Sequence, residues 1–271
     1  MNTEGREKHE GHARYASPFD LSGKRAFVPG GYGGIGAAIA QGLAEAGAAV
    51  TVAGRSAVKA QALAQKLVAS GHTAHGIALD GQKVDSIRSA VDAAAQRMGG
   101  LDLLVNCIGM NREQKIDDVT EETFDEIYRA NLRSAMFLAQ AAARHQVAGG
   151  RGGKQIHMLS VRAQLGMRGF GYSAYCATKG ALVMLVKQHA LELAPHNIQV
   201  NGVAPTVVLT EAAEKWRSDE KRWQALLARI PLGRVAQARD VAGATLFFCS
   251  SASDFVTGQV LYVDGGITAS Q

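Results

Sequence analysis

The stretch Gly30-Gly-Tyr-Gly-Gly-Ile-Gly36 lies between a short apolar run at 24–29 and an alanine-rich segment that begins at Gly34. It fits the pattern G-x-G-x-x-G from Gly31 and the pattern G-x-x-x-G-x-G from Gly30. Glycine lets backbone N–H groups approach a pyrophosphate, and the N-terminus of a following helix adds favourable charge. The stretch therefore predicts a dinucleotide-binding loop rather than a tight turn alone. The residues expected at the cofactor are Gly30, Tyr32, Gly34, Ile35 and Gly36.

Outward from this loop, short β-rich runs alternate with helical stretches along the whole chain. The expected strands are 24–29, 49–53, 73–79, 101–107, 155–160, 198–203 and 260–263. The expected helices are 34–47, 57–70, 84–98, 120–147 (with a break near its start), 173–193 and 238–249. This alternation predicts an α/β protein with a single-domain Rossmann fold, in which helices cover both faces of a doubly wound parallel sheet of about seven strands.

The length and the composition fit one domain. The chain has 271 residues, 47% of them hydrophobic, and no linker or repeat interrupts it after residue 20. We expect the domain to span 21–271 and the polar residues 1–20 to form a disordered leader, unless they are an expression remnant. The segment 209–232 contains two tryptophans and many charges and departs from the alternation, which predicts a substrate lid.

Several classes of protein are disfavoured by composition. The sequence contains no run of about 18 apolar residues, so no membrane-spanning segment is expected. Residues 1–17 also lack the apolar core of a secretory signal. The three cysteines are far apart and lack metal-type spacing to any histidine, which favours reduced thiols in a cytoplasmic protein without a metal. The net charge of +5 is modest and scattered, so nucleic acid is not an expected partner, whereas an anionic cofactor or substrate suits it.

The end of the second expected strand bears on the choice of dinucleotide. A carboxylate there would hold the ribose diol and repel a 2′-phosphate. The chain instead has Ala53-Gly54-Arg55-Ser56, with a guanidinium available for phosphate. We expect Arg55 and Ser56 to favour NADP(H), with NAD(H) possible, unless Arg55 is simply solvated or stacks on adenine. Asp80, followed by Gly81, could accept from the adenine amino group or could cap the next helix.

A proton-transfer site is predicted from Tyr175 and Lys179, which are four residues apart and share one face of a helix. A neighbouring ammonium favours phenolate and so lowers the pKa of the tyrosine. Ser160 ends the fifth expected strand, at the sheet edge where ligands bind. Its hydroxyl could hold a substrate oxygen, although such a serine can also be structural. Asn131 interrupts a long helical stretch, which suggests a break or a polar network.

These residues, taken together, resemble the short-chain dehydrogenase/reductase family from about residue 21 to residue 267. The resemblance rests on motifs in the order typical of that family. They are Gly30…Gly34-Ile-Gly36, Asp80, Leu104-Val-Asn106-Cys-Ile-Gly109, Asn131-Leu132, Ser160, Tyr175…Lys179, Asn201-Gly-Val-Ala-Pro205 and Val263-Asp-Gly-Gly266.

The resemblance implies a role for each matching residue. Tyr175 would be the general acid/base, Lys179 would bind the nicotinamide ribose and lower the pKa of Tyr175, and Ser160 would orient the substrate oxygen. Asn131 would hold a water that links Lys179 to solvent. The remaining expected cofactor contacts are Asn106 and Gly109 on the adenosine side, and Pro205, Val208 and Thr210 near the carboxamide. A homotetramer is also expected.

The chain departs from the family pattern in four places. Pro29 replaces a threonine before the first glycine, Cys107-Ile108 replaces Asn-Ala, and Thr206 replaces a glycine after Pro205. Ser160 and Tyr175 are also two residues further apart than is typical, within 166–172. Tyr172 and Ser173 are near rivals of Tyr175, but neither has a lysine four residues later.

The subtype resembles sugar and polyol dehydrogenases of the xylulose and gluconate types. In that case the enzyme would transfer a hydride between a nicotinamide cofactor and a secondary alcohol or ketone of a polyol, sugar or sugar acid. Arg112 or Arg162 could help to bind a sugar acid, or both could be solvated. The alternatives are a 3-oxoacyl-thioester reductase and a non-catalytic dinucleotide-binding protein.

Overall fold

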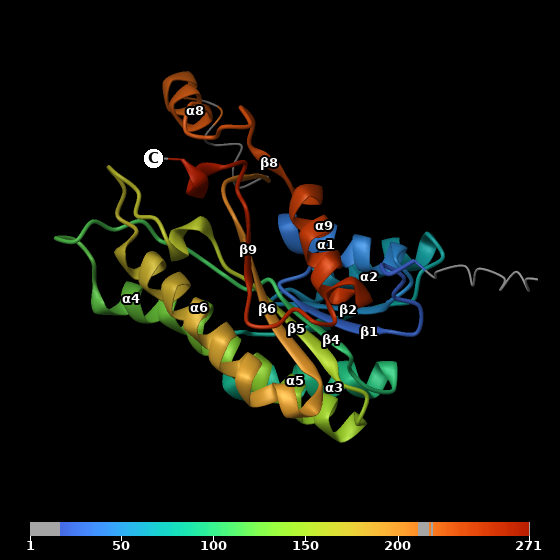
Figure 1. The fold of residues 1–271 in the computed structure, drawn as a ribbon. Helices are drawn as coiled ribbons and strands as arrows, with labels where there is room; N and C mark the ends of the chain where they lie inside the picture. Colours follow the sequence, from blue (N-terminus) through green and yellow to red (C-terminus); the bar gives the residue numbers. More distant parts are fainter. Residues whose placement is uncertain (1–16, 211–216, 218, 271) are drawn as a thin grey trace, which may run out of the picture.

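The computed structural model describes residues 17–210, 217 and 219–270 (Figure 1). Most of the expected leader, residues 1–16, lies outside this range, as do residues 211–216 and 218 of the expected lid. Within the described ranges, no helix is both long enough and apolar enough to span a bilayer.

Seven parallel strands form one sheet, as the sequence predicts, and the structure places them in the order β3-β2-β1-β4-β5-β6-β9. The order reverses between β1 and β4, and in open α/β sheets ligands bind beyond the carboxyl ends of the strands at such a switch point. The strands are β1 (Arg25–Pro29), β2 (Ala49–Gly54), β3 (Ala74–Ala78), β4 (Leu103–Asn106), β5 (Gly153–Met158), β6 (Ile198–Pro205) and β9 (Val260–Val263).

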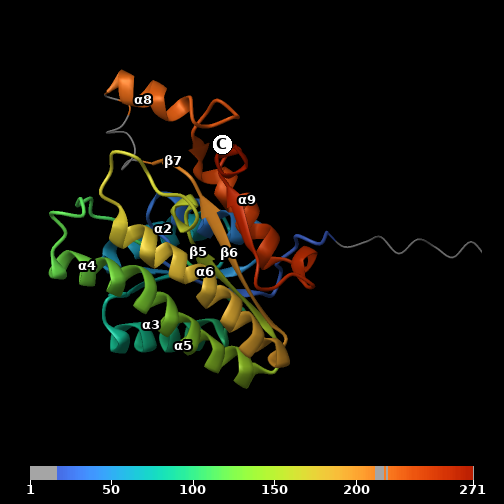
Figure 2. The ribbon, with the colours of Figure 1, turned by 60° about the vertical axis from the view of Figure 1, so that its left-hand side comes forward.

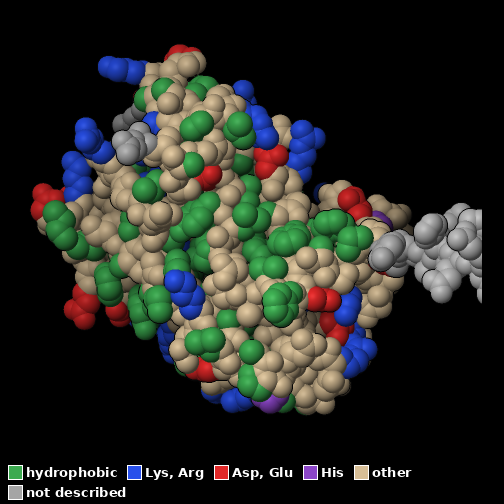
Figure 3. Space-filling view, in the orientation of Figure 1, with side chains coloured by type: hydrophobic (Ala, Val, Ile, Leu, Met, Phe, Trp, Pro, Cys, Tyr) green, Lys and Arg blue, Asp and Glu red, His purple; other side chains and the backbone are tan. Residues whose placement is uncertain are grey.

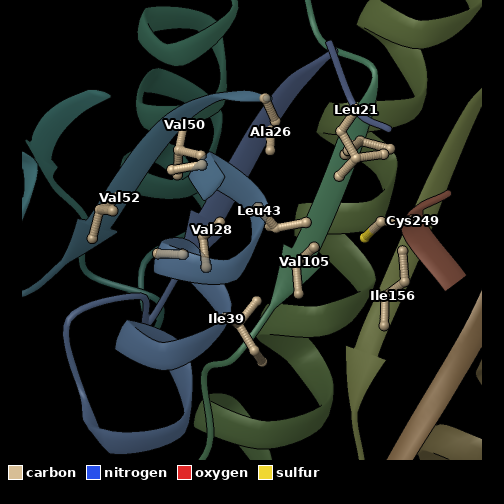
Figure 4. Packing of buried hydrophobic residues seen from close by; sticks show 14 of the residues in the cluster. Leu21, Ala26, Val28, Ile39, Leu43, Val50, Val52, Val105, Ile156 and Cys249 are labelled. Atoms are coloured by element: carbon tan, nitrogen blue, oxygen red, sulfur yellow. The ribbon is translucent and has the colours of Figure 1, made fainter. Parts of the chain in front are cut away.

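Helices cover both faces of the sheet (Figures 1 and 2). The helices α1 (Gly34–Glu45), α2 (Ala57–Ala69) and α9 (Ala238–Cys249) pack on one face, and α3 (Val84–Met98), α5 (Ser134–Gly149) and α6 (Ser173–Leu193) pack on the other. Figure 4 shows the first layer, where Val28, Val50 and Val105 of the strands meet Ile39 and Leu43 of α1. Because both faces are buried, the strands are almost continuously apolar.

The long helix expected at 120–147 is broken near its start, as predicted. It consists of α4 (Glu121–Tyr128), a π-helix at Arg129–Arg133 and α5. A π-turn inside an α-helix often accompanies a functional site.

The expected lid segment contains α8 (Glu220–Leu227). On either side of it, β7 (Val208–Leu209) and β8 (Ala236–Gln237) pair in a second, two-stranded sheet. Four buried residues hold this region together, with Leu165 and Leu209 packed against them. They are Leu226, Ile230, Val235 and Ile267.

Candidate active site

The glycine loop follows β1 and has no room for side chains. Gly30 has φ +77°, and a Cβ there would lie 2.8 Å from the carbonyl carbon of Cys107. A Cβ on Gly36 would collide with the carbonyl oxygen of Gly30. Helix α1 begins after Gly33 without a side-chain cap, so its first N–H groups can bind an anion. This cradle fits a dinucleotide pyrophosphate.

Tyr32 and Ser56 connect the glycine loop to the end of β2. The Tyr32 hydroxyl accepts a hydrogen bond from the backbone N–H of Ser56 at 3.1 Å, and the ring packs against Gly54. The Ser56 hydroxyl caps α2 by accepting from the N–H of Lys59 at 3.3 Å. Arg55 is exposed, and within the described part of the chain it forms no hydrogen bond or ion pair. Its guanidinium therefore has its full hydrogen-bonding capacity available for a ligand.

Asp80 does not cap the next helix, so that alternative was wrong. The N-cap residue of α3 is Lys83, whereas Asp80 accepts from the N–H of Gln82 at 3.1 Å and forms a local turn. The physical reason is that a short aspartate side chain readily bonds the backbone two residues later. Gly81 packs under Ile108, since a Cβ on this glycine would lie 2.7 Å from the Ile108 side chain.

Asn106 and Gly109 occupy different environments, although both were expected on the adenosine side. Asn106 is buried at the end of β4, where its Oδ1 accepts from the N–H of Ile108 at 3.0 Å and shapes the loop. A Cβ on Gly109 would lie 3.4 Å from Lys179 Nζ and 3.6 Å from Asn131 Oδ1. Gly109 therefore lies beside the candidate proton-transfer residues.

Tyr175 and Lys179 project from the same face of α6, near the carboxyl end of β5. The Lys179 Nζ lies 5.7 Å from the centre of the Tyr175 ring and donates to the Met158 carbonyl at 2.7 Å. Lys179 is buried, and burial lowers its pKa to about 8. Lys179 is thus still mostly charged at pH 7, but its pKa is shifted toward neutrality, as is common for residues of functional sites.

The predicted direction of the Tyr175 pKa shift was wrong for the structure. Burial raises this pKa above its ordinary value, and a hydrogen bond with the Ser160 side chain only partly offsets the rise. The reason is that helical spacing places an ammonium nearby but says nothing about how far the phenol is removed from water.

Asn131 lies in the π-helix and is fully buried. Its Oδ1 accepts from the Met110 N–H at 2.8 Å, while its Nδ2 donates to the Met110 carbonyl at 3.0 Å and to the Thr178 hydroxyl at 3.1 Å. Thr178 precedes Lys179 on α6. The Asn131 side chain therefore fixes the loop after β4 to helix α6, one residue before the lysine.

Ser160 lies near Tyr175 despite the longer spacing between them. Its backbone is extended, and its hydroxyl accepts from the Arg162 N–H at 3.1 Å, at the start of the 3-10 helix Val161–Ala163 (η2). The segment 166–172, which contains the additional residues, lies against the loop after β4, where the Gly171 carbonyl accepts a hydrogen bond from the Gln114 N–H at 3.0 Å. The additional residues are thus accommodated outside the Ser160–Tyr175 pair.

Pro205 ends β6, and the chain beyond it returns to the glycine loop. Val208 is buried in β7, and a Cβ on Gly34 would lie 2.5 Å from the Thr210 methyl group. Gly34, expected at the pyrophosphate, and Thr210, expected at the carboxamide, thus lie next to each other.

Sequence reasoning missed two residues at this site. Thr178 orients Asn131, and its position between Tyr175 and Lys179 on one helix was an available signal. His157 is buried on β5, with its Nδ1 3.4 Å from the Asn106 amide nitrogen, and burial lowers its pKa to about 3. No sequence signal marks His157, because its partner lies 51 residues away.

Comparison with known proteins agrees with this geometry. A family model described as Enoyl-(Acyl carrier protein) reductase matches residues 31–268. Gluconate 5-dehydrogenase of Gluconobacter oxydans is 38% identical over 93% of this chain and 97% of its own length. L-xylulose reductase of Mesocricetus auratus is 38% identical over 91% of this chain and 97% of its own length.

A solved structure extends the likeness to the fold. The gluconate 5-dehydrogenase of Burkholderia cenocepacia, in complex with NADP and tartrate, superposes with a TM-score of 0.89 at 38% identity, covering 94% of this chain and 98% of that one. The chain belongs to the short-chain dehydrogenase/reductase family. It is an NAD(P)-dependent oxidoreductase that acts on CH–OH groups, which confirms the enzyme class predicted from the sequence.

Proposed function

We propose that this protein is an NADP(H)-preferring dehydrogenase that interconverts a secondary alcohol and a ketone on a sugar acid, sugar or polyol. One observation carries the reaction type: Tyr175, Lys179 and Ser160 converge at the carboxyl edge of the sheet, on which the glycine loop also opens. The substrate class is supported by relatives named for gluconate and xylulose.

Each candidate residue has a role that follows from its contacts. The nicotinamide, when bound, donates or accepts the hydride. Tyr175 gives a proton to the substrate oxygen or takes one from it, and Ser160 holds that oxygen through its hydroxyl. Lys179 supplies positive charge near the phenol, and Asn131 fixes the loop beside the lysine and can bind a relay water.

The preference for NADP(H) is supported by Arg55 at the end of β2. Its guanidinium is exposed and, among the described residues, unpaired, as a ligand for a 2′-phosphate should be. Homologous structures also contain NADP, including one named as a putative 2-deoxy-d-gluconate 3-dehydrogenase from Agrobacterium tumefaciens. NAD(H) remains a possible second cofactor.

A 3-oxoacyl-thioester reductase is the second candidate, because the matching family model bears the name of an acyl-carrier-protein reductase. A non-catalytic role is disfavoured, since such a protein would not need Asn131, Ser160, Tyr175 and Lys179 together.

A substrate screen tests the proposal. Sugar acids, their keto forms, polyols and acetoacetyl thioesters are incubated with NADP(H) or NAD(H), and the absorbance of the reduced nicotinamide is followed. We expect the fastest turnover with a sugar acid or polyol and NADP(H). Turnover of acetoacetyl thioesters with indifference to all polyhydroxy substrates would support the second candidate instead.

We also propose a homotetramer, in keeping with the family resemblance. Hydrophobic side chains gather over the middle of the face in Figure 3, where β9 runs in Figure 1, and Leu261 on this strand is exposed. A groove of about 520 Å³ lies between α5 and α6, where Met136 and Val147 are also exposed. Sedimentation velocity measures the assembly, and a stable monomer would contradict the proposal. A cytoplasmic location stays a prediction.

A further inference from the structure

Arg162 is a buried cation without a carboxylate partner. It is 9% exposed and lies in η2, two residues after Ser160. Its Nη1 donates to the carbonyls of Leu165 and Gly166, at 3.2 and 2.6 Å. Within the described ranges, no aspartate or glutamate forms an ion pair with it. Backbone carbonyls satisfy part of its hydrogen-bonding capacity but leave its charge uncompensated, which is costly inside a protein.

A second arginine lies on the segment that follows α8. Arg229 follows α8 and is exposed, and it stands between the buried residues Leu226 and Ile230. These two pack in one apolar cluster with Leu165, whose carbonyl accepts from Arg162. The cluster therefore holds the segment that carries Arg229 against the loop that Arg162 braces.

The electrostatics agree with this geometry. Burial lowers the pKa of Arg162, and the positive charge of Arg229 lowers that pKa further, while Tyr172, Tyr175 and Cys176 act in the opposite direction. The exposed carboxylate of Glu113 raises the pKa of Tyr172. Two guanidinium groups thus repel each other close to the candidate acid/base, and an anion between them would relieve both the repulsion and the burial cost.

We propose that Arg162 and Arg229 form an anion subsite that binds the carboxylate of the substrate and selects sugar acids over neutral polyols. A guanidinium fork matches the two oxygens of a carboxylate. The inference rests on the proposed function, because it assigns the substrate class of the same site. The competing explanation is that Arg162 only braces the loop at 164–171.

The first test uses two ketones that differ only in the group to be recognised: 5-ketogluconate, which carries a carboxylate, and L-sorbose, which carries a hydroxymethyl group at that position. We expect Arg229→Gln to lower kcat/KM for 5-ketogluconate about ten-fold, and for L-sorbose less than about two-fold. Lys221→Gln is the matched control, because it removes the same charge from an exposed residue on α8, and it should change neither value. Equal losses on both ketones in Arg229→Gln would overturn the subsite.

Arg162 is tested by Arg162→Gln and Arg162→Lys, with thermal unfolding measured alongside the kinetics. A carboxylate-binding role predicts a selective loss of about a hundred-fold on 5-ketogluconate, partly restored by lysine. A mere brace predicts equal losses on both ketones together with a lower Tm, and that result would overturn the role of Arg162. Preference for L-sorbose 6-phosphate, which carries a phosphate at the position of the carboxylate, over 5-ketogluconate by ten-fold would overturn the carboxylate assignment in favour of phosphate.

A binding measurement separates this inference from the proposed function. Malonate, an unreactive dicarboxylate, is titrated into the NADPH-loaded enzyme by calorimetry. We expect saturable binding that Arg229→Gln weakens about ten-fold and Lys221→Gln leaves unchanged. If the wild type reduces neither ketone but binds malonate in this way, the function fails and the subsite stands. Malonate affinity that is absent, or unaltered by Arg229→Gln, overturns the subsite even where turnover is found.

Discussion

The two sides of the sheet's carboxyl edge are built on different physical principles. On the dinucleotide side, after β1 and β2, the decisive feature is the lack of space: a Cβ on Gly30 or Gly36 would meet backbone atoms that cannot move aside. On the substrate side, around β5 and α6, the decisive features are buried polar side chains, such as Lys179 and Arg162, that are held by backbone carbonyls.

This difference determines which amino-acid substitutions each side accepts. Where backbone segments lie this close together, only glycine fits, and the fit does not depend on pH or on the charge of neighbouring side chains. A site made of buried polar side chains can accept several residue types, but each buried charge or polar group needs a hydrogen-bond or ionic partner. We therefore expect mutations on the first side to act on cofactor binding, and mutations on the second side to act on rate, stability and substrate choice.

The largest expected effect is on the substrate side. Tyr175→Phe removes the hydroxyl that exchanges a proton with the substrate but keeps the ring, so kcat should fall about a thousand-fold. Cofactor affinity, measured by fluorescence titration with NADPH, should change less than about three-fold. Turnover within a few-fold of the wild type would remove Tyr175 from the acid/base role and favour Tyr172, whose ring centre lies 6.1 Å away.

The matching change on the dinucleotide side is Gly36→Ala. The new methyl group would collide with the Gly30 carbonyl and displace the loop, so NADPH should bind about a hundred-fold more weakly. Gly33→Ala is the control, since φ there is −88° and a Cβ would lie 3.8 Å from its nearest neighbour. Equal affinities in the two variants would show that lack of space does not govern this side.

The same contrast explains how much could be predicted from the sequence. The glycine loop and the seven strands depend on local spacing and apolar runs, so the fold was predictable. The Asn131 amide binds Thr178, 47 residues away, and the charge of Arg229 acts on Arg162 only because Leu226 and Ile230 pack against Leu165. Such long-range contacts leave no periodic pattern. The prediction that the pKa of Tyr175 is lowered was wrong for the same reason, because the burial that raises it depends on tertiary packing.

The third prediction concerns how much the burial of the Lys179 charge lowers the stability of the folded protein. The pKa of Lys179 is lowered from 10.5 to about 8, so the unfolded chain binds more protons than the folded one between these values. Stability of the wild type should thus rise with pH from about 8 to 10.5. Lys179→Met avoids burying the charge and should raise the free energy of unfolding by about 2 kcal/mol at pH 7 while abolishing turnover.

Denaturant unfolding at pH 7 and pH 10 measures this effect. The advantage of Lys179→Met should shrink at the higher pH, because the wild-type lysine is then largely neutral in the folded state. Leu182→Met, on the same helix and also buried, controls for the introduced methionine and should show no such pH dependence. A methionine variant less stable than the wild type at pH 7 would mean that the bond to the Met158 carbonyl outweighs the burial cost.

The smallest expected effect probes the one part of the dinucleotide side that depends on charge rather than on space. Arg55→Ala should weaken NADPH binding about ten-fold and NADH binding less than about two-fold, because a guanidinium can pair with the 2′-phosphate that NADH lacks. Arg88→Ala, an exposed arginine on α3, is the control for net charge. Fluorescence titration at two salt concentrations measures both cofactors, and the NADPH effect should diminish at high salt. Equal losses for the two cofactors would assign Arg55 to adenine stacking, and this side would then be governed by shape throughout.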